Sequence, residues 1–82
     1  PVVECVFEDW KQSPDDGTVI GFLAKFARGL MARYIIANRI DRVEGLKDFN
    51  WQRYEFQPKR STVNRLVFAR EFIPVEASRS QD

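Results

Sequence analysis

Apolar and polar residues alternate along residues 2–10, which is the pattern of a half-buried β-strand. Three apolar residues fall on one side of the extended segment and two glutamates fall on the other: Val3, Cys5 and Phe7 against Glu4 and Glu8. Residues 12–17 (QSPDDG) combine Pro, Asp and Gly, which is typical of a turn. Residues 18–22 then favour a returning strand, so this part of the sequence predicts a β-hairpin.

The pattern after the hairpin predicts a helix that starts between Ala24 and Arg28 and ends at about Arg39. With about 100° between successive residues, an apolar arc opposes a basic arc. The apolar arc holds Leu23, Phe26, Ala27, Leu30, Met31, Tyr34 and Ala37. The basic arc holds Lys25, Arg28, Arg33 and Arg39, with the small residues Gly29 and Ala32 among them. Small side chains let the backbone of a partner come close, so the segment predicts an amphipathic helix with a basic binding face.

The second half of the sequence predicts one more helix and two more strands. Asp41 and Glu44 have the spacing of a capping box, which predicts a short helix over residues 42–49. A strand follows with Tyr54 and Phe56 as its inward residues, then a polar loop, and residues 66–72 form the last strand. The expected fold class is therefore α+β in the order ββ-αα-ββ, that is, a β-hairpin, two consecutive helices and two more strands.

The composition limits the chain to one small domain with a modest core. We assign residues 1–76 to this domain and expect residues 77–82 to form a polar, disordered tail. With no His and a single Cys among the 82 residues, a disulfide framework, a zinc finger and a His-based triad within the chain are excluded. Apolar stretches run for only a few residues, so we expect no membrane span. The lone Cys5 fits a reducing, cytoplasmic setting.

The net charge of +1 conceals a basic block in the middle of the chain. Residues 17–40 carry four basic residues and no acidic one, which suggests an anionic partner at this place. A solvated helix face is the alternative interpretation. If the helix begins near Ala27, Lys25 and Arg28 flank its N-terminus, where free backbone N–H groups also attract anions.

Catalytic chemistry finds little support in the sequence. Asp15 and Asp16 fall in a turn, where Asp is favoured for backbone reasons. Asp41 and Glu44 are explained by the capping box, and Cys5 by a small buried hydrophobic residue. We therefore predict no catalytic residue, no metal site and no cofactor, and an enzyme is the less favoured class.

Three stretches of the sequence carry a family resemblance: residues 2–11 (VVECVFEDWK), residues 24–36 and, most specifically, residues 27–36 (ARGLMARYII). Residues 38–40, 46–49, 54–56 and 66–70 continue the match in the same order and at similar spacing. Together these segments resemble the C-terminal third of the YaaA peroxide-stress family. The resemblance covers about residues 2–72, and it implies that the chain is part of a larger single-domain fold.

This resemblance implies a cytoplasmic protein that helps cells to survive hydrogen peroxide, by limiting free intracellular iron and its damage to DNA. The family is described as DNA-binding, with its own fold, a basic cleft and a helix-hairpin-helix-like element. The matching residues that would bind DNA here are Lys25, Arg28, Gly29 and Arg33. The chain departs from the family pattern at Phe26, where a second Lys is usual, and at the longer, acidic turn near its start.

Three functions remain open at this point. The first is a sequence-tolerant DNA-binding surface in which Lys25, Arg28, Gly29, Arg33 and Arg39 contact the phosphate backbone. The second is a structural role, in which the arginines pair with acids in the remainder of the parent chain. The third is one wall of an active site that binds an anionic small molecule. We also expect that an exposed apolar face lets the chain associate with itself, and we expect no contact with membranes.

Overall fold

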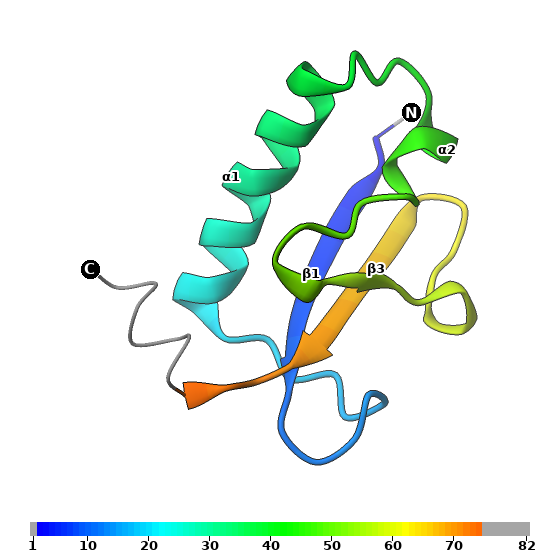
Figure 1. Ribbon diagram of the computed structural model, residues 1–82. Coiled ribbons are helices and arrows are strands. Elements are labelled where there is room, and N and C mark those ends of the chain that lie inside the picture. The colour runs from blue at the N-terminus through cyan, green and yellow to red at the C-terminus, as the bar shows by residue number, and fades with distance from the viewer. Residues whose placement is uncertain (1, 75–82) are drawn as a thin grey trace.

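The computed structural model describes residues 2–74 of the chain, and these residues form a layer of strands with one long helix against it (Figure 1). The elements in chain order are β1 (Glu4–Trp10), α1 (Gly21–Ala37), α2 (Val43–Leu46), β2 (Glu55–Phe56) and β3 (Arg65–Glu71). A short turn at Trp51–Arg53, in which Gln52 and Arg53 have positive φ of 56° and 70°, precedes β2, and a 3₁₀ turn at Pro58–Arg60 follows it. The α+β class is therefore as expected from the sequence.

The described strands form a three-stranded mixed sheet in the order β1-β3-β2. β1 runs parallel to β3, with Phe7 opposite Phe68. β2 runs antiparallel to β3 from the other side, with Phe56 opposite the same Phe68. β3 is the central strand, and its residues 66–70 are all buried, so both of its faces are covered. A continuous buried run is typical of a central strand.

The predicted β-hairpin is wrong. Residues 18–20 belong to no strand, and a single hydrogen bond of 3.0 Å, from the Asp9 amide to the Thr18 carbonyl, joins them to β1. Leu23 and Ala24 are buried from the first turn of α1, so the helical apolar face draws residues from 21 onward into the helix. The helix then supplies the crossover that a parallel β1–β3 pair needs. The expected order ββ-αα-ββ is replaced by one strand, the helical segment and two strands.

The bounds of both helices also differ from the prediction. α1 begins at Gly21, so Lys25 and Arg28 lie within the helix and do not flank its N-terminus. α2 is a single turn, and its N-cap residue is Arg42, which makes no side-chain capping hydrogen bond. The capping box expected from Asp41 and Glu44 is therefore not formed, and the short helix does not extend over residues 42–49.

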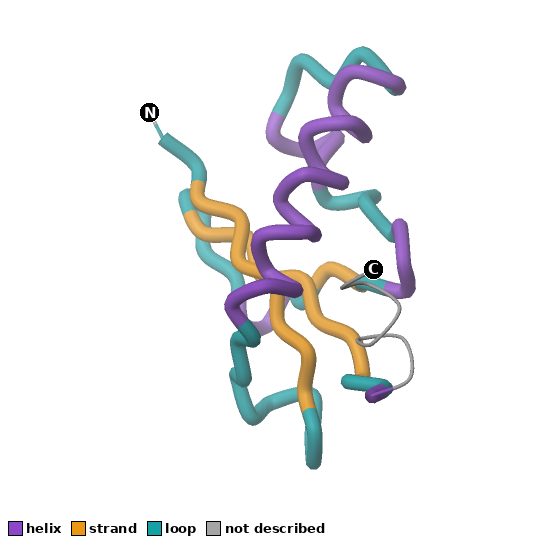
Figure 2. Tube along the Cα trace, turned by 90° about the vertical axis from the view of Figure 1, so that its left-hand side faces the viewer, coloured by secondary structure: helices purple, strands orange, loops and turns teal. Residues whose placement is uncertain are grey.

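The core lies between α1 and one face of the sheet, which Figure 2 views from the helix side. Aromatic rings fill much of this core. Phe7 stacks on Phe68 at 5.3 Å between ring centroids and meets the edge of Phe49 at 5.9 Å. Tyr34 of α1 packs edge-on against Phe49 at 5.2 Å. Cys5 is half-buried beside this core, and burial, with the nearby Glu4 carboxylate, raises the pKa of its thiol. The thiol thus stays protonated at neutral pH, as the sequence interpretation of a small hydrophobic residue requires.

The structure describes residues 2–74, so it does not reach the predicted end of the domain or the predicted tail. The domain end at residue 76 and the polar tail at residues 77–82 lie outside the described residues. Among residues 2–74, no helix has the length and apolar character needed to cross a membrane.

Candidate nucleic-acid interface

The four helical members of the predicted basic site lie on α1 and are exposed to solvent: Lys25, Arg28, Gly29 and Arg33. The opposite side of α1 is buried against the sheet and carries Leu23, Ala24, Ala27, Leu30, Met31 and Tyr34. The helical period of the sequence thus places the basic residues on the side of α1 that faces away from the core. Figure 2 views the molecule from the side of α1.

Positive charge on α1 is not neutralised within the described part of the chain. Residues 17–40 contain no acidic residue, so no helical neighbour can pair with the bases. The ion pairs found among residues 2–74 belong to arginines outside α1, namely Arg60 with Glu8, Arg65 with Glu4 and Arg70 with Asp9. The basic residues of α1 therefore form no ion pair with an acidic residue among residues 2–74.

A shallow groove runs along the exposed side of α1. It encloses about 370 Å³ and is lined by Phe22, Lys25, Phe26, Gly29 and Arg33. A Cβ atom added at Gly29 would meet nothing within 4 Å, so the missing side chain leaves the groove open at its middle. The sequence interpretation missed Phe22 because it assigned residues 18–22 to a strand. A helix start at Gly21 would have placed Phe22 and Phe26 one turn apart on the same side.

Arg39 is not part of the helical basic arc, because α1 ends at Ala37. Its backbone has φ of 51°, and it occupies the left-handed position that ends the helix. The Arg39 amide donates to the Ile36 carbonyl at 3.3 Å, and the Ile40 amide donates to the Ile35 carbonyl at 3.0 Å. These two bonds are the Schellman pattern, in which glycine is the usual residue. The residue is exposed, but its place is fixed by helix termination.

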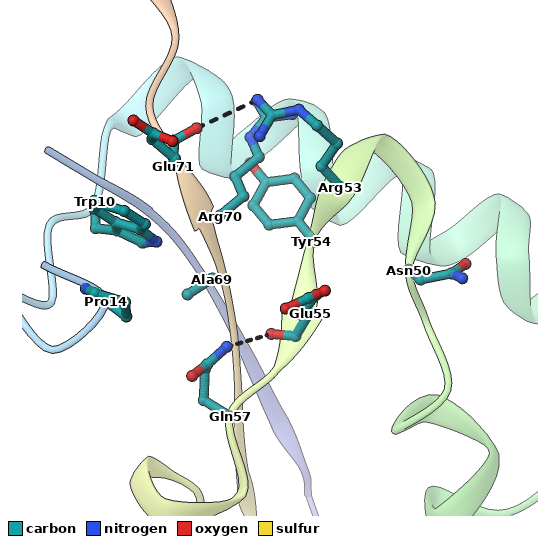
Figure 3. Close-up of a pocket in the computed structure, with 10 residues that line it drawn as sticks. All are labelled: Trp10, Pro14, Asn50, Arg53, Tyr54, Glu55, Gln57, Ala69, Arg70 and Glu71. Atoms are coloured by element: carbon teal, nitrogen blue, oxygen red, sulfur yellow. Dashed lines mark hydrogen bonds between the residues drawn. The ribbon is translucent and has the colours of Figure 1, made fainter.

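A larger cavity of about 590 Å³ lies across the sheet from the basic helix face, and Figure 3 shows the side chains that line it. Its charged residues are two arginines and two glutamates, Arg53, Arg70, Glu55 and Glu71. Arg53 donates from Nη2 to the backbone carbonyl of Glu71 at 3.3 Å. Because the charges of the lining balance, this cavity lacks the excess of one sign that the groove on α1 has.

A buried polar network beside that cavity was not predicted from the sequence. Asp9 accepts a hydrogen bond of 2.7 Å from the Tyr54 hydroxyl and one of 2.6 Å from Nε of Arg70. Arg70 also donates from Nη1 to the carbonyl of Gln52 at 2.8 Å. Burial, with the hydrogen bond to Asp9, raises the pKa of Tyr54 well above its ordinary value. Each charged residue in the network has a partner, so we interpret the network as one that holds the strand ends together.

The acidic turn near the start of the chain is also structural. Asp16 accepts hydrogen bonds from the amides of Lys11, Gln12 and Thr18, at 3.2, 3.2 and 3.0 Å. These backbone amides, chiefly that of Thr18, lower the pKa of the exposed Asp16 carboxyl to about 2. The expectation that Asp serves the backbone in this turn is confirmed for Asp16. No group of three or more candidate metal ligands occurs among residues 2–74.

Comparison with known proteins gives one family match and several relatives. A family model described as "Peroxide stress protein YaaA" matches residues 1–60. A UPF0246 protein of Bordetella pertussis is 49% identical over 70 residues, and one of Polaromonas naphthalenivorans is 52% identical over 69. A third, from Caulobacter vibrioides, is 54% identical over 70 residues. These alignments cover 84–85% of this chain but only 26–27% of the relatives. The chain thus spans about a quarter of the length of the curated relatives that it matches.

Proposed function

Because the chain belongs to the family of the peroxide stress protein YaaA, we propose that it contributes a DNA-binding surface to a protein that protects cells from peroxide and iron damage. The surface is the exposed side of α1, with Lys25, Arg28 and Arg33 as its phosphate-binding residues and Gly29 as the point of close approach. Arg39, beyond the helix end, adds positive charge near one end of this surface.

The observation that carries the proposal is the set of exposed bases on α1, which have no acidic partner among residues 2–74. At about 1.5 Å of rise per residue, Lys25 and Arg33 are separated by about 12 Å along the helix. This length suits contact with more than one phosphate of a DNA strand, since successive phosphates of one strand advance by about 3.4 Å along the duplex axis. Each neutralised phosphate releases counterions, which favours binding.

Binding of this kind is tolerant of sequence. Phosphate contacts fix the position of a protein on DNA, whereas base edges carry the sequence information. The exposed side of α1 offers Lys and Arg but neither Asn nor Gln, the residues that pair with adenine in the major groove. We therefore expect similar affinity for different DNA sequences.

A salt titration of DNA binding tests the proposal. Fluorescence anisotropy measures the binding of two duplexes of unrelated sequence at each salt concentration. The double variant Arg28→Ala/Arg33→Ala should weaken binding to both duplexes alike and make the slope of log K against log salt shallower by about 2. The matched control is Arg42→Ala/Lys59→Ala, which removes the same charge from exposed residues outside α1. Equal effects of the two double variants would contradict a site on α1.

The same titration on the full-length protein distinguishes DNA binding from the structural alternative, in which the arginines pair within the parent chain. If Arg28 and Arg33 pair with acids elsewhere in the parent chain, the full-length protein will not bind DNA through them. The double variant would then unfold more readily in the full-length protein, because its partner acids lose their cations. DNA binding that depends on Arg28 and Arg33 in both proteins supports the proposed function.

A further inference from the structure

We propose that the groove on α1 takes an unpaired nucleotide of single-stranded DNA, with the base against Phe22 and the neighbouring phosphates on Lys25 and Arg33. This inference rests on the proposed function, because it assumes that the basic face of α1 binds DNA. It adds the kind of DNA that is bound, which basic residues on a helix face do not by themselves specify.

Two aromatic side chains, Phe22 and Phe26, line the groove beside its basic residues Lys25 and Arg33. Phe22 is 44% exposed, so a large part of its ring is in contact with water. Phe26 is only partly buried and packs against the core, which holds it in place as a wall of the groove. An exposed ring next to positive charges is the combination by which proteins bind single strands, since bases stack on the ring while the backbone follows the charges.

The charged residues stand on either side of the open middle of the groove. Lys25 and Arg33 both line it, and Gly29 lies between them along the helix. A Cβ at Gly29 would meet nothing within 4 Å, so packing inside the described chain does not require glycine at this position. A glycine disfavours an α-helix, and its value here is the room that it leaves for a ligand.

The shape and chemistry of the groove favour an unpaired base over other occupants. Its volume of about 370 Å³ is at the small end of the range for ligand pockets, which suits a single base. In duplex DNA both faces of each base are covered by neighbouring bases, so only an unpaired base can lay its face on Phe22. An apolar protein segment would leave the charges of Lys25 and Arg33 without partners, which argues against a purely apolar occupant.

The experiment compares two oligonucleotides with the same number of phosphates. One is oligo-dT. The other has abasic residues in place of the thymidines, so that it keeps the sugars and phosphates and lacks the bases. The chain should bind oligo-dT more tightly than the abasic strand by roughly 5- to 150-fold, the range expected for one stacked base. The variant Phe22→Leu should lose this preference, and Phe22→Tyr should keep it because the ring face remains.

Matched measurements separate this inference from the proposed function. Ile36→Ala removes an exposed apolar side chain from the same helix outside the groove, and it should leave the preference for oligo-dT intact. Ile36→Ala should also leave duplex affinity and its salt dependence unchanged. Duplex binding by the wild-type chain with no preference for oligo-dT, or a preference that survives Phe22→Leu, would overturn the inference alone. Absence of binding to the duplex and to both single strands would overturn the proposed function with it.

Discussion

Tyr54 donates a hydrogen bond of 2.7 Å to Asp9, a residue 45 positions earlier in the chain. Both side chains are buried, with 0% and 2% of their surfaces exposed. The guanidinium of Arg70 lies 4.3 Å from the centre of the Tyr54 ring and donates to the second oxygen of Asp9. Because Asp9 is on β1, Arg70 is on β3 and Tyr54 immediately precedes β2, one polar network ties together the three strands.

Tyr54→Phe should lower the free energy of unfolding by about 1.5–3 kcal/mol, because it removes a buried hydrogen bond to a charged group. Urea unfolding followed by Trp fluorescence measures the change. Tyr34→Phe is the control, since the Tyr34 hydroxyl makes only a long hydrogen bond of 3.4 Å to the carbonyl of Gly45. Equal losses for the two variants would show that the bond to Asp9 has no special weight.

Stability should also fall in alkaline solution because of Tyr54. Burial and the hydrogen bond to Asp9 raise the pKa of Tyr54 above its ordinary value of 10.0 in the folded chain. A raised folded pKa contributes stability that is complete below about pH 10 and is lost as the pH rises further, because the unfolded chain releases the proton first. The free energy of unfolding of the wild type should therefore decline more steeply above pH 10 than that of Tyr54→Phe. Parallel declines in urea unfolding would contradict this role of Tyr54.

Asp16 should act in the opposite direction, in acid. Its pKa is lowered to about 2 by the backbone amides, chiefly that of Thr18, so the turn is stabilised above the ordinary value of 3.8 and loses this support as the pH falls through about 2. An NMR titration of the Asp16 carboxyl carbon measures the midpoint directly. Asp16→Asn should remove the acid-dependent shift of the Thr18 amide resonance. A carboxyl midpoint at the ordinary value would contradict the three hydrogen bonds.

The helix face was predictable from the sequence because α1 is 17 residues long, so the apolar pattern repeats over several turns of about 3.6 residues each. The start of α1 was not predictable, since its N-cap residue Ile20 makes no side-chain capping hydrogen bond and so leaves no capping signal. Phe22 was missed for this reason. The basic residues were placed on the exposed face without knowledge of the start, because their angular positions depend only on the period.

Strand pairing was the part of the fold that local patterns could not reveal. The turn signal at residues 12–17 was correct, yet the chain leaves it for a helix, and β1 pairs with β3 near the other end of the sequence. The unbroken apolar run at residues 66–69 was the available hint of a central strand. Asp9, Tyr54 and Arg70 meet only through this pairing, and therefore no spacing in the sequence could have brought them together.

Arg39→Gly should raise the free energy of unfolding by about 0.5–1 kcal/mol. A left-handed residue other than glycine costs about 1–2 kcal/mol, and the greater freedom of glycine in the unfolded chain offsets part of this gain. Ala37→Gly, inside the end of α1, should instead destabilise the chain by about 1 kcal/mol. Urea unfolding distinguishes the two signs. Destabilisation by Arg39→Gly would mean that the arginine side chain contributes more than its backbone strain costs.

Gly29→Ala should separate folding from binding. The added methyl group meets nothing within 4 Å, so alanine should stabilise the exposed helix by about 1 kcal/mol. The same methyl group stands between Lys25 and Arg33, where it should keep DNA from close contact and lower affinity. Ala32→Gly, an exposed position on the same helix, is the reverse control: it should destabilise the chain by about 1 kcal/mol without lowering the affinity of the folded protein. Urea unfolding and anisotropy on the same samples give both values. If Gly29→Ala stabilises the chain and leaves DNA affinity unchanged, the backbone at Gly29 does not meet the DNA.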